Sequence, residues 1–277
     1  MKLGFIDYYL DEWHANHYPQ WIKDLSGGEM EVAYAYAEID APNGLTTDEW
    51  CSQNQIQRIN SIEELVALSD GIIVLSPDHA DRHEDLCRIP LASGKRCYVD
   101  KTFAPDKETA QRIFKNAEDH GTPCYSTSAL RYALEYQDID PNEVVAISSW
   151  GPFTYEIYSI HQLEPVLTFI NSTPKRVMMN QCPGVWYTLN IEFEDGRMAS
   201  ISGFEKGGPF AMNIALRDAR SQTIKVTSDY FAEFLKELVR FFQTGEARVP
   251  HQTTINIMAV RAAGKRAMAT PGTWIKV

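Results

Sequence analysis

Residues 71–103 read GIIVLSPDHADRHEDLCRIPLASGKRCYVDKTF, and this stretch decides the fold class. Gly71–Leu75 is an apolar, largely β-branched run that ends at Ser76-Pro77, a pattern typical of a buried parallel strand. A helix is predicted from about Asp81 to Ala92, because Gly94 is the kind of residue that follows a helix end. A second strand is predicted at Lys95–Asp100. A strand, a helix and a strand of these lengths indicate a βαβ unit in a parallel sheet.

The same alternation continues on both sides of this stretch. Further strands are predicted at residues 2–7, 31–38 and 123–128, and further helices at about 17–25, 61–68 and 106–120. Repeated βαβ units predict an α/β domain with a Rossmann-like, doubly wound parallel sheet. Ligands of such a sheet bind at the carboxyl ends of its strands.

The second half of the chain has a different pattern. Tight turns such as Glu194-Asp195-Gly196 join short segments of strand character, and helices are expected at about 158–171, 230–244 and 252–269. The strands are predicted at residues 144–150, 175–181, 186–194, 198–204, 210–216 and 223–227. We therefore expect residues 1–130 to form a Rossmann-like α/β domain. Residues 131–277 should form an α+β domain with a large, mainly antiparallel sheet.

Composition narrows the class of partner. The chain has 26 lysines and arginines against 37 aspartates and glutamates, a net charge of −11, and an acidic surface repels nucleic-acid phosphates. No apolar run is long enough for a membrane span, and the first residues resemble a strand rather than a signal peptide. We expect a cytoplasmic protein with no nucleic-acid or membrane partner. The five cysteines are scattered, and His79 and His83 lack an evident third ligand, so no disulfide framework or metal site is predicted.

Several short motifs follow one another in a set order. They are Ser76-Pro77, His83-Glu84, Ala92-Ser93-Gly94-Lys95, Asp100-Lys101-Thr102, Ser128-Ala129-Leu130-Arg131, His161-Gln162-Leu163-Glu164 and Gly245–Pro250. In this order they resemble the signature of the glucose-fructose oxidoreductase and inositol dehydrogenase (Gfo/Idh/MocA) family. The resemblance covers nearly the whole chain. It implies that residues 1–130 are a dinucleotide-binding-type domain and that residues 131–277 are a substrate and oligomerisation domain. It also implies the oxidation of sugars or polyols with NAD or NADP.

One segment departs from the family pattern. The first strand should run into a Gly-x-Gly-x-x-Gly/Ala loop, but Asp7, Tyr9 and Glu12 stand at the nominal glycine positions. Those glycines let the backbone approach a pyrophosphate at a helix N-terminus. Here Asp7, Asp11 and Glu12 place carboxylates where phosphates would lie, and each like-charge pair costs about 3 kcal/mol at roughly 6 Å and an effective dielectric of about 20. Either the loop takes another path around the cofactor, or the dinucleotide binds weakly, or it does not bind.

The segment after this loop is also unusual. Residues 13–18 read WHANHY, which is rich in aromatic and imidazole groups. Two interpretations stay open: these groups line a polar ligand pocket, or they fill a vacated cofactor groove.

The resemblance implies roles for individual residues. Lys101 is expected to contact the nicotinamide end of the cofactor and a substrate hydroxyl. His161 is expected to act as general base, because an imidazole pKa near 6.5 suits proton transfer from an alcohol. The predicted substrate-binding residues are Arg131, Tyr158 and Glu164, and Glu164 can alternatively orient His161 from one helical turn away. The predicted cofactor-binding residues are Asp7, Tyr9, Glu38 (with Asp40 as the competing ribose ligand), Ser76, Pro77, Asp100 and Lys101.

Two further departures lie near the expected chemistry. Asp100-Lys101-Thr102 replaces the family's Glu-Lys-Pro, and Ile157 stands where the family has an aspartate. Three functions therefore compete. The first, and the leading prediction, is an oxidoreductase that moves a hydride between NAD or NADP and a sugar, polyol or similar substrate. The second is a cofactor-independent isomerase or lyase, and the third is a ligand-binding sensor without catalysis. A homodimer or homotetramer is expected, because one face of the large sheet needs cover.

Overall fold

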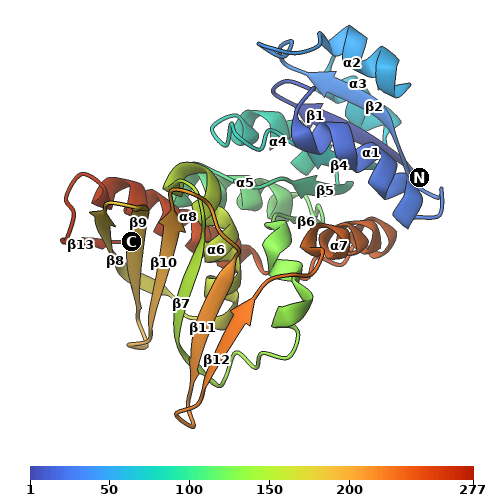
Figure 1. Ribbon diagram of the computed structural model, residues 1–277. Coiled ribbons are helices and arrows are strands. Elements are labelled where there is room, and N and C mark those ends of the chain that lie inside the picture. Colours follow the sequence, from blue (N-terminus) through green and yellow to red (C-terminus); the bar gives the residue numbers. More distant parts are fainter. The chain divides into compact units, whose positions relative to one another are not determined.

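The computed structural model describes residues 1–277 and divides into two compact units (Figure 1). The first unit contains Met1–Thr127 and Leu235–His251, and the second contains Ser128–Phe234 and Gln252–Val277. The predicted domain ranges, 1–130 and 131–277, differ from these units chiefly because residues 235–251 pack with the N-terminal part of the chain.

The first unit is built on a six-stranded parallel sheet with the order β3-β2-β1-β4-β5-β6. This order and direction confirm the predicted doubly wound sheet. The buried strands β1 and β4 carry apolar side chains on both faces, because helices cover both sides. The strands are β1 (Lys2–Asp7), β2 (Glu31–Ala37), β3 (Gln57–Arg58), β4 (Gly71–Val74), β5 (Arg96–Val99) and β6 (Cys124–Tyr125).

Most helices of this unit begin at a capping side chain, but α4 (His83–Leu91) does not. Ser61 caps α3 (Ile62–Leu68) and Asp106 caps α5 (Lys107–Asp119). The α2 helix (Thr47–Asn54) was not predicted, although Thr46 and Glu49 form a capping box. The predicted start of the first helix near residue 17 is wrong: α1 covers Trp13–Leu25, with Glu12 as its cap.

The C-terminal half of α7 (Tyr230–Thr244) belongs to the first unit for a packing reason. The Phe242 ring lies so close to Gly71 that a Cβ atom there would come within 2.8 Å of it. Phe241 packs edge-on against Tyr125, with ring centroids 4.8 Å apart. His251 stacks on Phe114 at 3.9 Å. These aromatic contacts join residues 235–251 to the sheet and helices of the first unit.

The second unit contains a seven-stranded sheet with the order β12-β11-β7-β10-β9-β8-β13. All neighbouring pairs are antiparallel except β7 and β10, so the prediction of a mainly antiparallel sheet is confirmed. The strands are β7 (Val144–Pro152), β8 (Pro174–Cys182), β9 (Val185–Phe193), β10 (Met198–Phe204), β11 (Ala211–Leu216), β12 (Ser221–Lys225) and β13 (Trp274–Lys276). The strand β13 was not predicted.

Two helices cover one face of this sheet. Tyr155, at the start of α6 (Tyr155–Phe169), is buried against Tyr187 of β9 and donates a hydrogen bond to the Arg261 carbonyl of α8 (His251–Ala267) at 3.1 Å. Two short 3₁₀ turns, η1 (Ala129–Tyr132) and η2 (Leu134–Tyr136), precede β7. Gly264 is required beside Tyr155, because a Cβ atom there would lie 2.0 Å from the Tyr155 hydroxyl.

The opposite face of the sheet carries small polar side chains. Ser148 and Ser200 are hydrogen-bonded across β7 and β10 at 3.1 Å, and Thr188 and Ser202 across β9 and β10 at 2.9 Å. A shallow hollow lies here, lined by residues of β7, β9, β10, β11 and β12, among them Asn190. The same hollow also contains the exposed side chain of Met198, so polar and apolar groups are mixed on this face.

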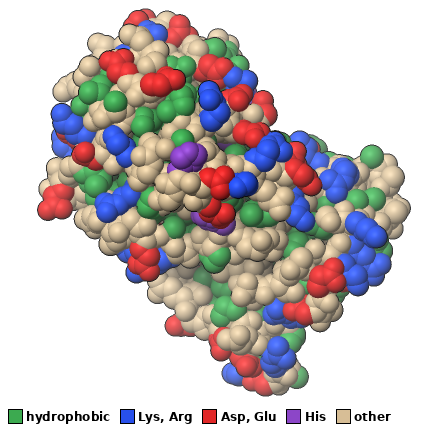
Figure 2. Space-filling view, turned by 180° about the vertical axis from the view of Figure 1, so that it is seen from behind, with side chains coloured by type: hydrophobic (Ala, Val, Ile, Leu, Met, Phe, Trp, Pro, Cys, Tyr) green, Lys and Arg blue, Asp and Glu red, His purple; other side chains and the backbone are tan.

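No helix combines the length and apolar character that a membrane crossing requires. On the face drawn in Figure 2, acidic and basic side chains are interspersed rather than separated into two fields.

Candidate functional site

Three neighbouring strands of the first unit end in polar residues at the edge where such sheets bind ligands. Asp7 ends β1, Ser76 follows β4 by two residues, and Asp100 follows β5 directly. The backbone places them together, because Leu75 N–H bonds to the Ile6 carbonyl and Asp100 N–H to the Val74 carbonyl, both at 2.8 Å. All three side chains are buried.

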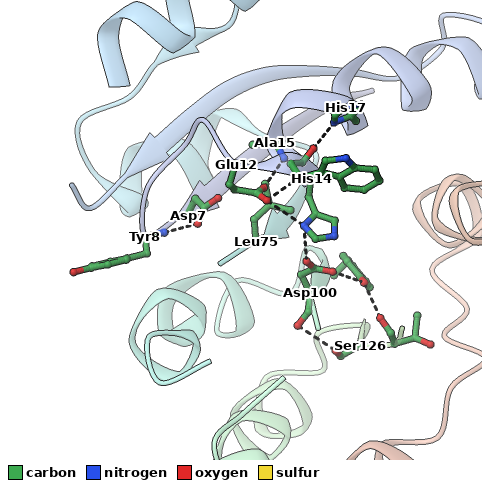
Figure 3. A network of polar contacts seen from close by, with 12 residues as sticks. Asp7, Tyr8, Glu12, His14, Ala15, His17, Leu75, Asp100 and Ser126 are labelled. Carbon is green, nitrogen blue, oxygen red and sulfur yellow. Dashed lines mark hydrogen bonds and ion pairs between the residues drawn. The ribbon is translucent and has the colours of Figure 1, made fainter. Parts of the chain in front are cut away.

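The start of α1 lies beside this edge, and Glu12 occupies it (Figure 3). Its Oε2 accepts the His14 N–H at 2.8 Å, and its Oε1 accepts the Ala15 N–H at 2.5 Å. The His14 ring lies between two acids, with Nδ1 3.1 Å from Glu12 and 3.6 Å from Asp100. A side-chain carboxylate thus takes the backbone donors that a phosphate uses in dinucleotide-binding sheets.

Asp7, at the end of β1, is a further buried acid at this edge of the sheet. Its Oδ1 accepts the Tyr8 N–H at 2.7 Å, while Oδ2 has no hydrogen-bond partner. Burial, and next the negative charge of Glu12, raises the pKa of Asp7 well above its usual value. Asp100 contributes in the same direction. This edge of the sheet is therefore unfavourable for additional negative charge.

Glu38, the predicted ribose ligand, is engaged elsewhere. Arg82 forms two hydrogen bonds to the Glu38 carboxylate, and its guanidinium lies over the Tyr8 ring, 5.3 Å from the centroid. Tyr9 packs against His79, with ring centroids 5.5 Å apart. Two of the predicted cofactor residues, Tyr9 and Pro77, are half-buried. Asp40, the competing ribose ligand, accepts the Thr47 N–H at 2.8 Å.

These observations test whether a dinucleotide fits the first unit in the usual way, and the residues do not fit it. Glu12 holds the helix N-terminal donors, Asp7 and Asp100 are buried beside them, and Glu38 is paired with Arg82. The structure also answers the question about residues 13–18. His14 and Tyr18 are buried and fill the space under the loop, whereas Trp13 is exposed and stacks on His17 at 4.6 Å. His14 and Tyr18 agree with the interpretation as filler, whereas the exposed Trp13 and its partner His17 do not.

Lys101 follows β5 and is half-buried. The segment after it is tied to β4 by His83, which is completely buried at the start of α4. The His83 Nδ1 lies 3.0 Å from the Phe103 carbonyl oxygen, and Nε2 lies 2.5 Å from the Leu75 carbonyl oxygen. Burial lowers the pKa of His83. The family-like His83 therefore positions the backbone next to Lys101 and is not available as a metal ligand.

His161 lies on α6 in the second unit, where Ser128 contacts it. The Ser128 Oγ is 2.7 Å from His161 Nδ1, and the same oxygen accepts the Leu130 N–H at 3.3 Å. The ring is flanked by Tyr158, with centroids 5.4 Å apart, and by Phe210 at 5.9 Å. Ser128 is fully buried and His161 is half-buried, so the serine can orient the imidazole while part of the ring stays accessible.

Arg131 and Glu164 form an ion pair in the same unit. The Arg131 Nε donates to Glu164 Oε1 at 2.7 Å, and the two side chains are only 12% and 3% exposed. The charge of Glu164 is thus directed at Arg131, and substrate contact by either residue stays a prediction.

Sequence reasoning brought some of these residues together and missed others. His161, Tyr158, Arg131 and Glu164 lie in the second unit, and the predicted cofactor residues lie in the first, together with Lys101. The roles of His14, Ser128 and Phe210 were not anticipated. An acid just before the helix start could have indicated Glu12 as a cap. No local signal links Ser128 to His161, because the pair is 33 residues apart.

Comparison with known proteins supports the fold. No family model matches the sequence, and no curated protein matches it. Among solved structures, the chain is similar to UDP-N-acetylglucosamine 3-dehydrogenase from Acidithiobacillus ferrooxidans, with a TM-score of 0.76, 14% identity, and 96% and 97% of the two chains covered. It is also similar to myo-inositol 2-dehydrogenase from Lactobacillus plantarum, with a TM-score of 0.78, 11% identity, and 100% and 99% covered.

A third similar structure is GenD2 from gentamicin A biosynthesis, solved in complex with NAD, with a TM-score of 0.76, 12% identity, and 100% and 96% covered. These full-length matches confirm the expected two-domain fold of the glucose-fructose oxidoreductase and inositol dehydrogenase type. At such low identity the likeness concerns the fold alone.

Proposed function

We propose that the protein catalyses proton transfer on a small hydroxylated carbonyl compound, such as a sugar or the keto form of a polyol, with His161 as the acid–base group. The observation that carries this proposal is the contact between Ser128 Oγ and His161 Nδ1 at 2.7 Å. A buried hydroxyl that accepts the Nδ1 proton leaves the lone pair on Nε2, which is the form a general base needs.

The chemistry open to this histidine is simple. Nε2 removes a proton from a substrate carbon next to a carbonyl and leaves an enediolate. If the imidazolium returns the proton to the neighbouring carbon, and the hydroxyl proton moves to the former carbonyl oxygen, the product is an isomer. If the enolate instead expels a β-hydroxyl that takes this proton, the products are water and an unsaturated carbonyl compound. Neither course requires an external oxidant.

Other residues are proposed to assist. Lys101, in the first unit, stays a predicted catalytic residue on the basis of the family resemblance alone. Arg131, held by Glu164, and Tyr158, beside the His161 ring, are proposed substrate contacts. Glu164 then acts through Arg131 as a positioning residue.

A second candidate function is the NAD- or NADP-dependent oxidation of a sugar or polyol. The likeness to dehydrogenases over the full chain favours it. This function requires the nucleotide to bind in another way than at the start of α1, since Glu12 and Asp7 oppose phosphates there. A homo-oligomer and a cytoplasmic location remain part of the proposal.

Isotope exchange tests the leading proposal. A panel of sugars, polyols and their keto forms is incubated with the protein in D₂O without nucleotide, and deuterium incorporation is followed by NMR. We expect exchange that is lost in His161→Gln and kept in His120→Gln, because His120 is an exposed histidine that bonds the Asn116 carbonyl. Exchange that survives in His161→Gln would overturn the proposal.

The same panel separates the other functions. Substrate oxidation that appears only with NAD or NADP would establish the second candidate. A ligand that raises the melting temperature but is not converted, with or without nucleotide, would indicate a sensor.

A further inference from the structure

We infer that the Glu12 carboxylate is an internal replacement for a ligand phosphate, which keeps the nucleotide crevice of the first unit closed. The inference concerns the start of α1 and does not depend on the chemistry proposed for His161.

The Glu12 carboxylate is bound in the way that a phosphate is bound at a helix N-terminus. Its two oxygens each accept one backbone N–H from the first turn of α1, from His14 and Ala15, at 2.8 and 2.5 Å. A phosphate at a helix N-terminus is held by the same kind of donors and by the positive end of the helix dipole. The side chain is only 11% exposed, so it is buried in this place rather than resting on the surface.

The loop that precedes α1 is also held in place by hydrogen bonds that Asp11 accepts. Asp11 accepts the Leu45 N–H at 2.9 Å through Oδ2 and the Asn16 side-chain N–H at 3.0 Å through Oδ1. Asn16 in turn accepts the Trp50 indole N–H at 2.6 Å. These bonds connect the loop to the segment before α2 and to α1 itself. Gly44 allows this approach, because a Cβ atom there would lie 2.3 Å from Asp11 Oδ2.

The acidic side chains around Glu12 also oppose a bound diphosphate. A diphosphate that displaced Glu12 would lie beside Asp7 and Asp100, both almost completely buried, with His14 as the imidazole between Glu12 and Asp100. Like charges in a poorly solvated site repel strongly. Towards the expected ribose position, Glu38 is already bound by Arg82. The α1 backbone donors and the Glu38 carboxylate are therefore already bound by the chain's own side chains.

Titration calorimetry with inorganic pyrophosphate tests the inference directly. We compare the wild-type chain with Glu12→Gly, which frees the α1 donors and restores glycine. Asp24→Gly, near the other end of α1, removes the same charge and serves as the matched control. We expect no saturable binding by the wild-type chain, and at least about tenfold tighter binding by Glu12→Gly than by Asp24→Gly.

A second variant covers the case in which Glu12→Gly does not fold. Glu12→Gln keeps the length and one acceptor oxygen but removes the charge, and it should also bind pyrophosphate more tightly than Asp24→Gly. Equal affinities of the folded Glu12 variants and the control would overturn the inference, since only net charge would then matter.

Nucleotide binding by the wild-type chain is the other decisive outcome. Saturable calorimetric binding of NAD or NADP at the start of α1, detected as changed amide signals of His14 and Ala15, would also overturn the inference. The His161 proposal is judged separately by deuterium exchange, so failure of one can be distinguished from failure of the other.

Discussion

The buried ion pair of Arg131 and Glu164 yields a quantitative prediction. The Arg131 Nε and Glu164 Oε1 atoms are 2.7 Å apart, in side chains that are 12% and 3% exposed. With charge centres about 4 Å apart and an effective dielectric of about 20, their attraction is about 4 kcal/mol. Removing one partner loses this attraction and leaves the other charge in a poorly solvated place, which typically costs about 3–5 kcal/mol.

We therefore expect Arg131→Met to lower the free energy of unfolding of the second unit by about 3–4 kcal/mol. Glu164→Gln should cost about 2 kcal/mol, because glutamine keeps an acceptor for the guanidinium. The double variant leaves no unpaired charge, so its loss should be at least about 2 kcal/mol smaller than the sum of the two single losses.

Urea unfolding at neutral pH, followed by circular dichroism, measures these differences. Lys175→Met serves as the control, because Lys175 pairs with Glu192 on the sheet surface and is 48% exposed, and such pairs contribute at most about 1 kcal/mol. The reasoning would be refuted if each single variant lost less than about 0.5 kcal/mol of the free energy of unfolding. It would also be refuted if the loss in the double variant equalled the sum of the two single losses.

Three further predictions concern single residues. Asp7→Asn should raise stability at neutral pH, because the raised pKa of Asp7 means that wild-type stability falls as pH rises above the unfolded value, about 3.9, and asparagine still accepts the Tyr8 N–H. The urea midpoint of Asp7→Asn should therefore exceed that of the wild-type chain by a margin that grows as pH rises. A margin that does not change with pH would contradict this. Burial opposes ionisation of Glu135, but hydrogen bonds from Ser228 and Thr227 lower the pKa of Glu135 to about 2. Its contribution is present above the unfolded pKa and is lost as pH falls towards 2, so the acid-side loss of stability should be smaller in Glu135→Gln. Ser128→Ala should lower kcat/KM of the exchange reaction roughly tenfold and change its pH profile, whereas Ser128→Thr should restore it; an unchanged profile in Ser128→Ala would exclude a positioning role.

Much of the architecture followed from local patterns. The apolar run at residues 71–75, the Ser61 and Asp106 caps and the glycines that end helices carry their information within a few residues, and the elements formed as predicted. The missed helix α2 also has such a local signal, the Thr46–Glu49 capping box, whereas the missed strands depend on packing. β3 has only two residues, and β13 has three, so neither contains enough sequence to show a period.

The site was only partly accessible from sequence. The loss of glycine at Asp7, Tyr9 and Glu12 was visible at once, together with the unfavourable charge that it brings. Glu12 was missed as the cap of α1 because the helix was expected to start near residue 17, four residues after its first residue in the structure. The acid before Trp13 is a local signal that could have corrected this start.

The sequence by itself determined the order of elements, the class of each half and the presence of carboxylates where glycines are expected. These properties depend on side-chain periodicity and on residue identity. The tertiary structure alone decided which partner each charge and each imidazole has: Glu12 at the start of α1, Glu38 with Arg82, Glu164 with Arg131 and Ser128 with His161. Such pairs join residues up to 44 positions apart, and only the packing of helices on sheets brings their atoms within hydrogen-bonding distance.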